Sequence, residues 1–160
     1  MPLGPAKALM PTRRSLIVWA AALGYGIFAG QKDAGLTANP DDAAQVAQGR
    51  QVYASQCASC HGGRLPGQPN WRQRQPNGRL PAPPHDETGH TWHHPDDLLF
   101  ALTKEGPAAL TRSAYQSDMP AFAGKLSDQD IWAVLAFIKS RWPKGVRERQ
   151  AAITHRAQKK

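Results

Sequence analysis

Residues 62–95 constrain the fold more than any other part of this 160-residue chain. Glycine and proline interrupt the segment so often that neither a helix nor a strand fits within it. The interrupting residues are Gly62, Gly63, Pro66, Gly67, Pro69, Pro76, Gly78, Pro81, Pro83, Pro84 and Gly89. A loop of this length without regular structure is uncommon in a compact domain, and wrapping around a flat cofactor would explain it.

The first predicted helix begins at residues 39–42 and runs to about Ser55. Asn39 can cap free amides, Pro40 suits the first helical position, and two aspartates favour the positive end of the helix dipole. Apolar or small residues then recur at helical spacing, namely Ala43, Val46, Ala47, Gly49 and Tyr53.

Two further helices are predicted after the long loop. One begins at residues 95–97 with two aspartates in its first turn, and Gly106 stops it. The other begins at Ser127, which with Asp130 approximates a capping box, and continues as an apolar helix. Strand patterns are absent, so the sequence predicts an all-α fold.

The pentapeptide at residues 57–61, Cys-Ala-Ser-Cys-His, carries the chemistry. Its spacing lets Cys57 and Cys60 each add to one vinyl group of a haem, with His61 as an axial ligand of the iron. A disulfide, a thioredoxin-like site or half of a zinc site are the alternatives. No strand pattern precedes the cysteines and no second ligand cluster stands at zinc spacing. We therefore expect one covalently bound haem c.

With this pentapeptide, the chain resembles the class I c-type cytochromes, the monohaem cytochrome c family, over residues 40–142. In that family a glycine and an aromatic residue, eight and four positions before the first cysteine, cross the last helix. Gly49 and Tyr53 match these two positions, and Val134 and Phe137 match their partners. The resemblance implies a cytochrome c fold with three to four helices and long loops wrapped around the haem.

The resemblance also implies a second axial ligand, a methionine in the loop before the last helix. Met119 matches it, since the other two methionines lie in the first ten residues, and Pro120 would stiffen its loop. Core packing is the alternative for a lone methionine, and His93 or His94 could replace it on iron. His61 and Met119 are thus the predicted metal ligands, a pair that raises the reduction potential.

Two more residues are expected to contact the cofactor or its ligand. Residues 80–84 resemble the family loop whose proline carbonyl accepts the N–H of the proximal histidine, which assigns Pro83 to His61. Ala82 stands where the family has glycine. Trp92 is expected to donate its indole N–H to a haem propionate, with ordinary packing as the alternative.

Residues 85–97 are crowded with histidine and acidic side chains: His85, Asp86, Glu87, His90, His93, His94, Asp96 and Asp97. Such a cluster could bind copper or zinc. It could equally be a polar loop that faces water, with His94 capping the next helix. Because no ligand pair repeats at helical spacing, the polar loop is the favoured interpretation.

The net charge of +8 is concentrated at the end of the chain. Residues 31–138 carry nine basic against eleven acidic side chains, whereas residues 139–160 carry eight basic side chains and one acid. We expect a solvated, flexible tail over residues 144–160 that could dock on an acidic partner or anionic lipid. No basic face interleaved with aromatic residues runs through the body, so nucleic-acid binding is not expected.

The first 30 residues have the composition of an export signal or a short membrane anchor. Basic residues precede an apolar run from residue 16 to residue 29, which is short for a membrane span. A linker over 31–39 would then lead to a cytochrome domain over 40–143. The expected location is the bacterial periplasm, with the protein soluble or anchored to the inner membrane by residues 15–30.

These expectations point to a single-electron carrier in a respiratory or other periplasmic chain, and not to an enzyme. Its redox partners would present an acidic docking surface. A haem-bearing subunit of a larger membrane oxidoreductase is the main alternative. A haem-c sensor or a peroxidase-like enzyme would need a labile sixth ligand on the iron.

Overall fold

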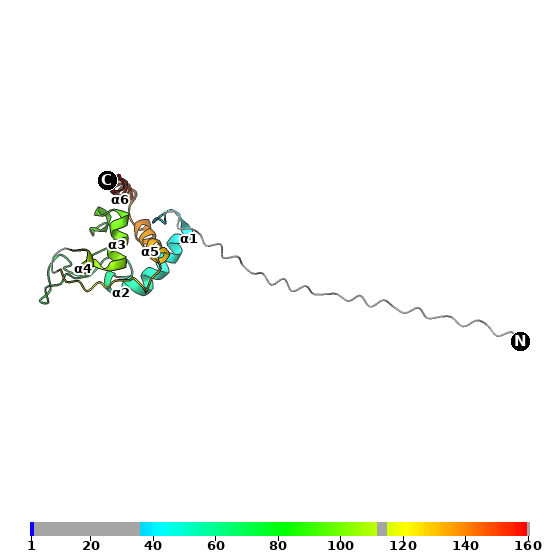
Figure 1. The fold of residues 1–160 in the computed structure, drawn as a ribbon, viewed down its shortest axis with the longest axis horizontal. Helices are drawn as coiled ribbons and strands as arrows, with labels where there is room; N and C mark the ends of the chain where they lie inside the picture. Colours follow the sequence, from blue (N-terminus) through cyan, green and yellow to red (C-terminus); the bar gives the residue numbers. More distant parts are fainter. Residues whose placement is uncertain (2–35, 112–114, 160) are drawn as a thin grey trace. The chain divides into compact units, whose positions relative to one another are not determined.

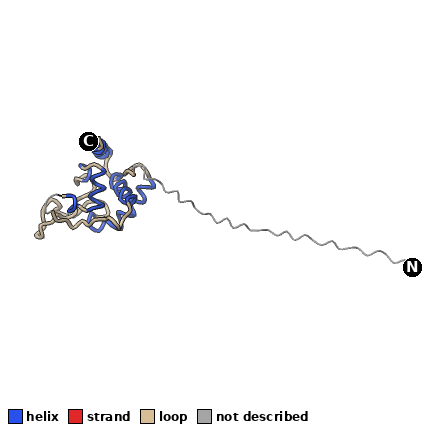
Figure 2. The backbone as a smooth tube through the Cα atoms, viewed as in Figure 1, coloured by secondary structure: helices blue, strands red, loops and turns tan. Residues whose placement is uncertain are grey.

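The described part of this computed structural model, residues 1, 36–111 and 115–159, consists of helices and loops without a strand (Figures 1 and 2). Within it, the longer helices are α1 (Ala43–Val52), α3 (Asp96–Glu105), α5 (Asp128–Ser140) and α6 (Lys144–Ala157). The short elements are the π-helical turn η1 (Tyr53–Cys57), α2 (Ala58–His61), the 3₁₀ turn η2 (Thr91–His93) and α4 (Pro107–Leu110). The predicted all-α fold class is confirmed.

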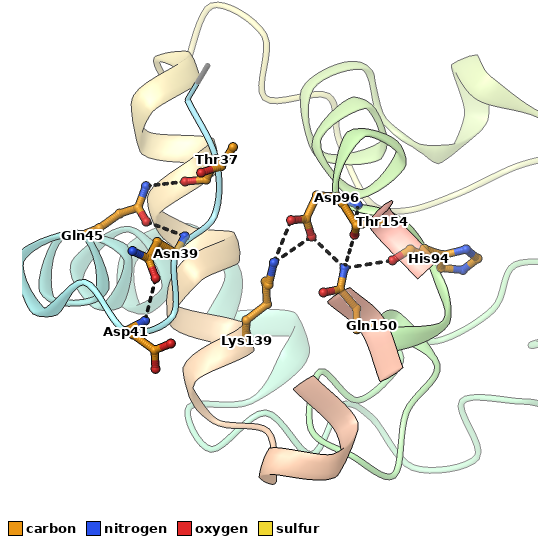
Figure 3. A network of polar contacts seen from close by, with 9 residues as sticks. All are labelled: Thr37, Asn39, Asp41, Gln45, His94, Asp96, Lys139, Gln150 and Thr154. Atoms are coloured by element: carbon orange, nitrogen blue, oxygen red, sulfur yellow. Dashed lines mark hydrogen bonds and ion pairs between the residues drawn. The ribbon is translucent and has the colours of Figure 1, made fainter. Parts of the chain in front are cut away.

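Helix α1 begins later than the sequence predicted, because Asp42 and not Asn39 caps it. The Asp42 side chain accepts hydrogen bonds from the N–H groups of Ala44 and Gln45, at 2.9 and 3.1 Å. The side-chain oxygen Oδ1 of Asn39 is already occupied before the helix, where it accepts the N–H of Asp41 at 3.0 Å (Figure 3). An Asx turn thus precedes the helix, which leaves the free amides of the first helical turn to Asp42.

The helices α1 and α5 lie side by side in a close crossing (Figure 1). At Gly49 the two backbones approach so closely that an added Cβ would stand 1.8 Å from the carbonyl oxygen of Ala133. One turn on, the rings of Tyr53 and Phe137 pack with centroids 5.3 Å apart, and Val134 is buried in the same cluster. The crossing predicted from the family resemblance is therefore confirmed.

Helix α5 has the capping box that the sequence predicted. The Ser127 hydroxyl accepts the N–H of Asp130, and the Asp130 carboxylate accepts the N–H of Ser127, both at 3.1 Å. The hydrogen bond from the Ser127 side chain and a second one from Gln48 lower the pKa of Asp130. The box fixes the start of the helix whose buried face forms much of the core.

The basic C-terminal segment forms helix α6, and the expectation of a flexible tail is wrong. Gln150 on α6 is fully buried, and its side-chain amide donates to the Asp96 carboxylate at 2.7 Å and to the His94 carbonyl at 3.2 Å. Asp96 also pairs with Lys139 of α5, as Figure 3 shows. A buried polar network therefore joins α3, α5 and α6, which charge composition alone does not reveal.

No helix in the described residues is long and apolar enough to cross a membrane. The predicted export signal or anchor over residues 1–30 lies, apart from Met1, outside the described part of the chain.

Candidate functional site

The pentapeptide lies at the end of the first helical stretch, at the edge of a pocket. Cys57 ends η1 and is half-buried, Cys60 is exposed, and His61 at the end of α2 is buried. The two cysteines do not form a disulfide with each other. Gly62 ends the helix with a φ of +76°, a left-handed conformation that suits glycine. The chain therefore turns away directly after His61, and the imidazole stays at the pocket.

The pocket has a volume of about 710 Å³, within the range of about 300–1,000 Å³ common for cofactor sites. Both cysteines, His61 and Met119 line it. Most of the remaining wall is apolar and comes from the long loop, α3, the segment before α5 and α5 itself: Leu80, Pro81, Leu98, Leu99, Leu102, Phe122, Val134, Leu135 and Ile138. This lining fits a large, flat, apolar cofactor that the two cysteine thiols could attach.

The proximal histidine is held by the long loop. Its Nδ1 lies 2.8 Å from the carbonyl oxygen of Pro83, which is the contact expected from residues 80–84. A carbonyl only accepts, so Nδ1 carries the proton and Nε2 is left as the nitrogen able to bind a metal. Burial lowers the pKa of His61, and the hydrogen bond to Pro83 opposes this shift in part. The imidazole is thus neutral at pH 7, as ligation requires.

The long loop is ordered by its own backbone, although it lacks regular structure. Gly67 donates to the carbonyl of His61 at 2.9 Å, and Gln68 donates to the carbonyl of Ala82 at 2.8 Å. At Gly67 φ is +66°, and an added Cβ would stand 2.5 Å from the carbonyl carbon of Pro83. This close approach lets one arm of the loop press Pro83 against His61.

Met119 lies in the loop before α5, half-buried, and lines the same pocket as His61. Its N–H donates to the hydroxyl of Ser117 at 3.1 Å. The neighbouring Asp118 forms an ion pair with Arg79 of the long loop. These contacts connect the methionine loop to the loop that carries Pro83, and the structure brings both predicted metal ligands to one cavity.

The two thiols differ in their surroundings. Burial, and secondarily the charge of Cys60, raises the pKa of Cys57 to about 11. Nearby, the hydroxyl of Tyr53 donates to the carbonyl of Gly62 at 3.1 Å. Cys57 is therefore a neutral thiol at pH 7 in the free chain, suited to burial against an apolar ring system.

Trp92 does not occupy the position that the sequence predicted. Its indole N–H donates to the carbonyl of Glu87 at 3.2 Å, and its ring stacks on His93 at 3.7 Å between centroids. It is not part of the pocket wall, where His90 and His94 are found instead. The indole proton is already used inside the loop, so the assignment of Trp92 to a cofactor carboxylate is corrected.

The histidine-rich loop does not gather into a metal site in the part of the chain that the structure describes, where no three metal-ligating side chains come together. Its residues separate: His90 stacks on Trp71, and His94 meets His90 edge to face. His85 instead stacks on His61, with ring centroids 3.8 Å apart. This neighbour of His61 was not predicted, although His85 stands only two residues after Pro83 in the chain.

A pocket lined by two cysteines, a neutral imidazole and a methionine, in an all-α fold in which helices α1 and α5 cross, defines a c-type cytochrome domain of class I. The family model described as cytochrome C oxidase, cbb3-type, subunit III matches residues 44–138, more than half of the chain. The chain belongs to this family, and it is a haem-c electron carrier with a covalently attached iron porphyrin. No solved structure matches the chain.

Proposed function

We propose that His61 and Met119 are the two axial ligands of the haem iron, and that the protein transfers single electrons without catalysing a reaction of its own. The observation that carries this proposal is that one apolar pocket contains both side chains and both cysteines. When bound, the haem iron supplies reversible one-electron oxidation. With both axial positions filled, no substrate would reach the iron, so the carrier role is favoured over a sensor or peroxidase role.

The chain's own residues divide the remaining work. Cys57 and Cys60 would hold the porphyrin edge as thioethers. Pro83 keeps a proton on Nδ1 of His61 and thereby orients Nε2 and makes it a better electron donor. The apolar wall excludes water, which disfavours the more highly charged ferric form and so raises the reduction potential.

Replacing Met119 by alanine tests the ligand assignment. In protein expressed with a haem-c maturation system, Met119→Ala should lose the methionine-to-iron charge-transfer band of the ferric form. Its reduction potential should fall, because a thioether stabilises Fe(II) relative to Fe(III). Optical spectra in both oxidation states and a redox titration measure the two effects.

Leu110→Ala is the matched control, since Leu110 lines the same pocket from its exposed side. It should keep the band and the potential. A wild-type protein without the band, or a Met119→Ala protein that retains it, would refute methionine ligation and favour a histidine as the sixth ligand.

We further propose that partners dock through the arginine loop, residues 62–84. This segment has four arginines and no acidic residue, and several of its side chains line the pocket. Arg72 and Arg74 are exposed, and Arg72 lies 4.1 Å over the ring of Trp71, itself part of the pocket wall. A positive surface beside the cofactor would attract an acidic partner and speed its encounter.

Neutralising this surface should slow electron transfer to an anion. In the variant Arg72→Gln with Arg74→Gln, the rate constant for oxidation of the ferrous protein by ferricyanide should fall about tenfold at low salt. The difference should shrink as salt rises. The control carries Arg149→Gln and Arg156→Gln, two exposed arginines on α6. Equal slowing in both variants, measured by stopped flow, would show an effect of net charge and not of this loop.

The family match also favours a second candidate, a haem-bearing subunit of a larger membrane oxidase, because its description names an oxidase subunit. We propose a periplasmic location for either role, supported by the basic and apolar composition of residues 1–30. Fractionation of expressing cells and sequencing of the mature N-terminus distinguish a cleaved, freely released carrier from an anchored subunit.

A further inference from the structure

His85 makes the closest aromatic contact of His61. The two imidazole rings stack with centroids 3.8 Å apart and an angle of 18° between their planes. His85 reaches this place because it follows the Pro83-Pro84 pair, whose first carbonyl is hydrogen-bonded to Nδ1 of His61. Residues 83–85 of the long loop therefore contact the His61 ring twice, with Pro83 at its edge and His85 on its face.

The backbone of His85 is fixed on both sides. Its N–H donates to the carbonyl of Leu65 at 2.9 Å, and its carbonyl accepts the indole N–H of Trp142 at 2.7 Å. The ring of Tyr53 meets the His85 ring edge-on, with centroids 6.0 Å apart. Leu65, Trp142 and Tyr53 belong to one buried cluster, so the stacked ring is anchored in the core.

An imidazole is an energetically unfavourable side chain at this buried position. Nδ1 of His85 is buried and has no hydrogen-bond partner. Burial, and then the neighbouring histidines His61 and His90, lowers the pKa of His85 well below its ordinary value, so the ring is neutral. An apolar side chain would fill the space without leaving a polar nitrogen unpaired. What the imidazole adds over an aliphatic side chain is a flat face parallel to His61.

We propose that His85 is a positioning residue that fixes the plane of the axial His61 ring by stacking on its face. The inference rests on the proposed role of His61 as an iron ligand. Pro83 alone leaves the ring free to swing about its hydrogen bond, whereas the stacked face removes that freedom. A fixed plane keeps the Nδ1–H···O=C bond short, which maintains the basicity of the ligand and holds the ferric haem in one electronic state.

The test compares two substitutions of the haem-loaded protein. His85→Phe keeps a flat ring, and His85→Leu keeps an apolar side chain of comparable bulk without one. The low-spin ferric EPR spectrum and the reduction potential are measured for each variant. We expect wild-type g values in His85→Phe. In His85→Leu we expect a broadened or shifted signal and a raised potential, because a weaker imidazole donor stabilises Fe(III) less.

Thermal unfolding of the same samples separates positioning from packing. If His85→Leu loses stability but keeps the wild-type EPR signal and potential, His85 only fills space and the proposal is refuted. Wild-type spectra in both variants also refute it. Failure of the proposed function would differ, because the wild-type protein itself would then lack the optical and EPR signals of an axial histidine. If neither variant accumulates with haem, NMR of the ferrous wild-type protein provides the test. The ring-proton lines of His61 should be narrow if the ring is fixed, and broad lines from a swinging ring would refute the proposal.

Discussion

Gly49→Val is expected to prevent stable folding of the domain. A Cβ at this position would stand 1.8 Å from the carbonyl oxygen and 2.4 Å from the carbonyl carbon of Ala133. These are backbone atoms of a buried helix, so α1 and α5 would have to separate. Overpacking of a core commonly costs about 1–3 kcal/mol, and a clash with backbone atoms costs more than that. The total stability of a domain is only about 5–15 kcal/mol, so the clash removes a large part of it.

The measurement is the yield of haem-loaded protein and its melting temperature. Gly145→Val is the control, because Gly145 lies in α6 and an added Cβ there meets nothing within 4 Å. The control should differ little from the wild type. A Gly49→Val protein that accumulates and melts like the control would show that the α1–α5 crossing is looser than the structure has it.

The crossing could be predicted from sequence because its partners sit at fixed distances from the cysteines. Gly49 and Tyr53 stand eight and four residues before Cys57, and α5 presents its apolar face at helical spacing. Helix starts were predicted less well. Asn39 and Asp42 are equally good caps, and only the turn actually adopted by Asn39 leaves Asp42 to cap the helix.

The parts of the site that short sequence motifs carry could be predicted. The pentapeptide fixes His61, and the proline loop places Pro83 on its ring. The neighbours that depend on how the long loop closes were not predictable. Trp92 donates its indole N–H to the carbonyl of Glu87, five residues away. His85 turns inward onto His61 because its backbone is held by Leu65 and Trp142, which are distant in sequence.

Helix α6 escaped prediction for a related reason. Its sequence is rich in basic side chains and resembles a solvated tail. It is held by Gln150, which bonds to Asp96 across 54 positions, and by Thr154, whose hydroxyl accepts the N–H of Asp96 at 3.1 Å. A polar pair this far apart leaves no periodic pattern in the sequence.

Lys139→Met is expected to destabilise the protein by about 3–5 kcal/mol, because it removes one partner of a buried ion pair. The ammonium of Lys139 lies 2.7 Å from the Asp96 carboxylate, and the two side chains are only 9% and 10% exposed. The substitution leaves the carboxylate buried, with the Gln150 amide as its remaining side-chain donor. Denaturant unfolding of the haem-loaded protein measures the loss.

Two comparisons establish whether the loss comes from the uncompensated charge. Lys144→Met breaks the exposed pair with Glu148 and should leave the stability nearly unchanged, because water screens an exposed ion pair. The double variant Lys139→Met with Asp96→Leu removes both charges and should recover most of the loss. A double variant as unstable as Lys139→Met would instead assign the loss to packing at the end of α5.

Lys139→Met should also weaken the attachment of α6 to the rest of the domain. Asp96 is the point at which Lys139, Gln150 and the backbone contact with Thr154 meet, so a displaced carboxylate weakens the attachment of α6 to α3 (Figure 3). Trypsin should therefore cut Lys139→Met within α6, after Arg147 or Arg149, faster than it cuts the Lys144→Met control. Equal cleavage rates would mean that α6 is held by its apolar contacts and that the buried network stabilises only the junction of α3 and α5.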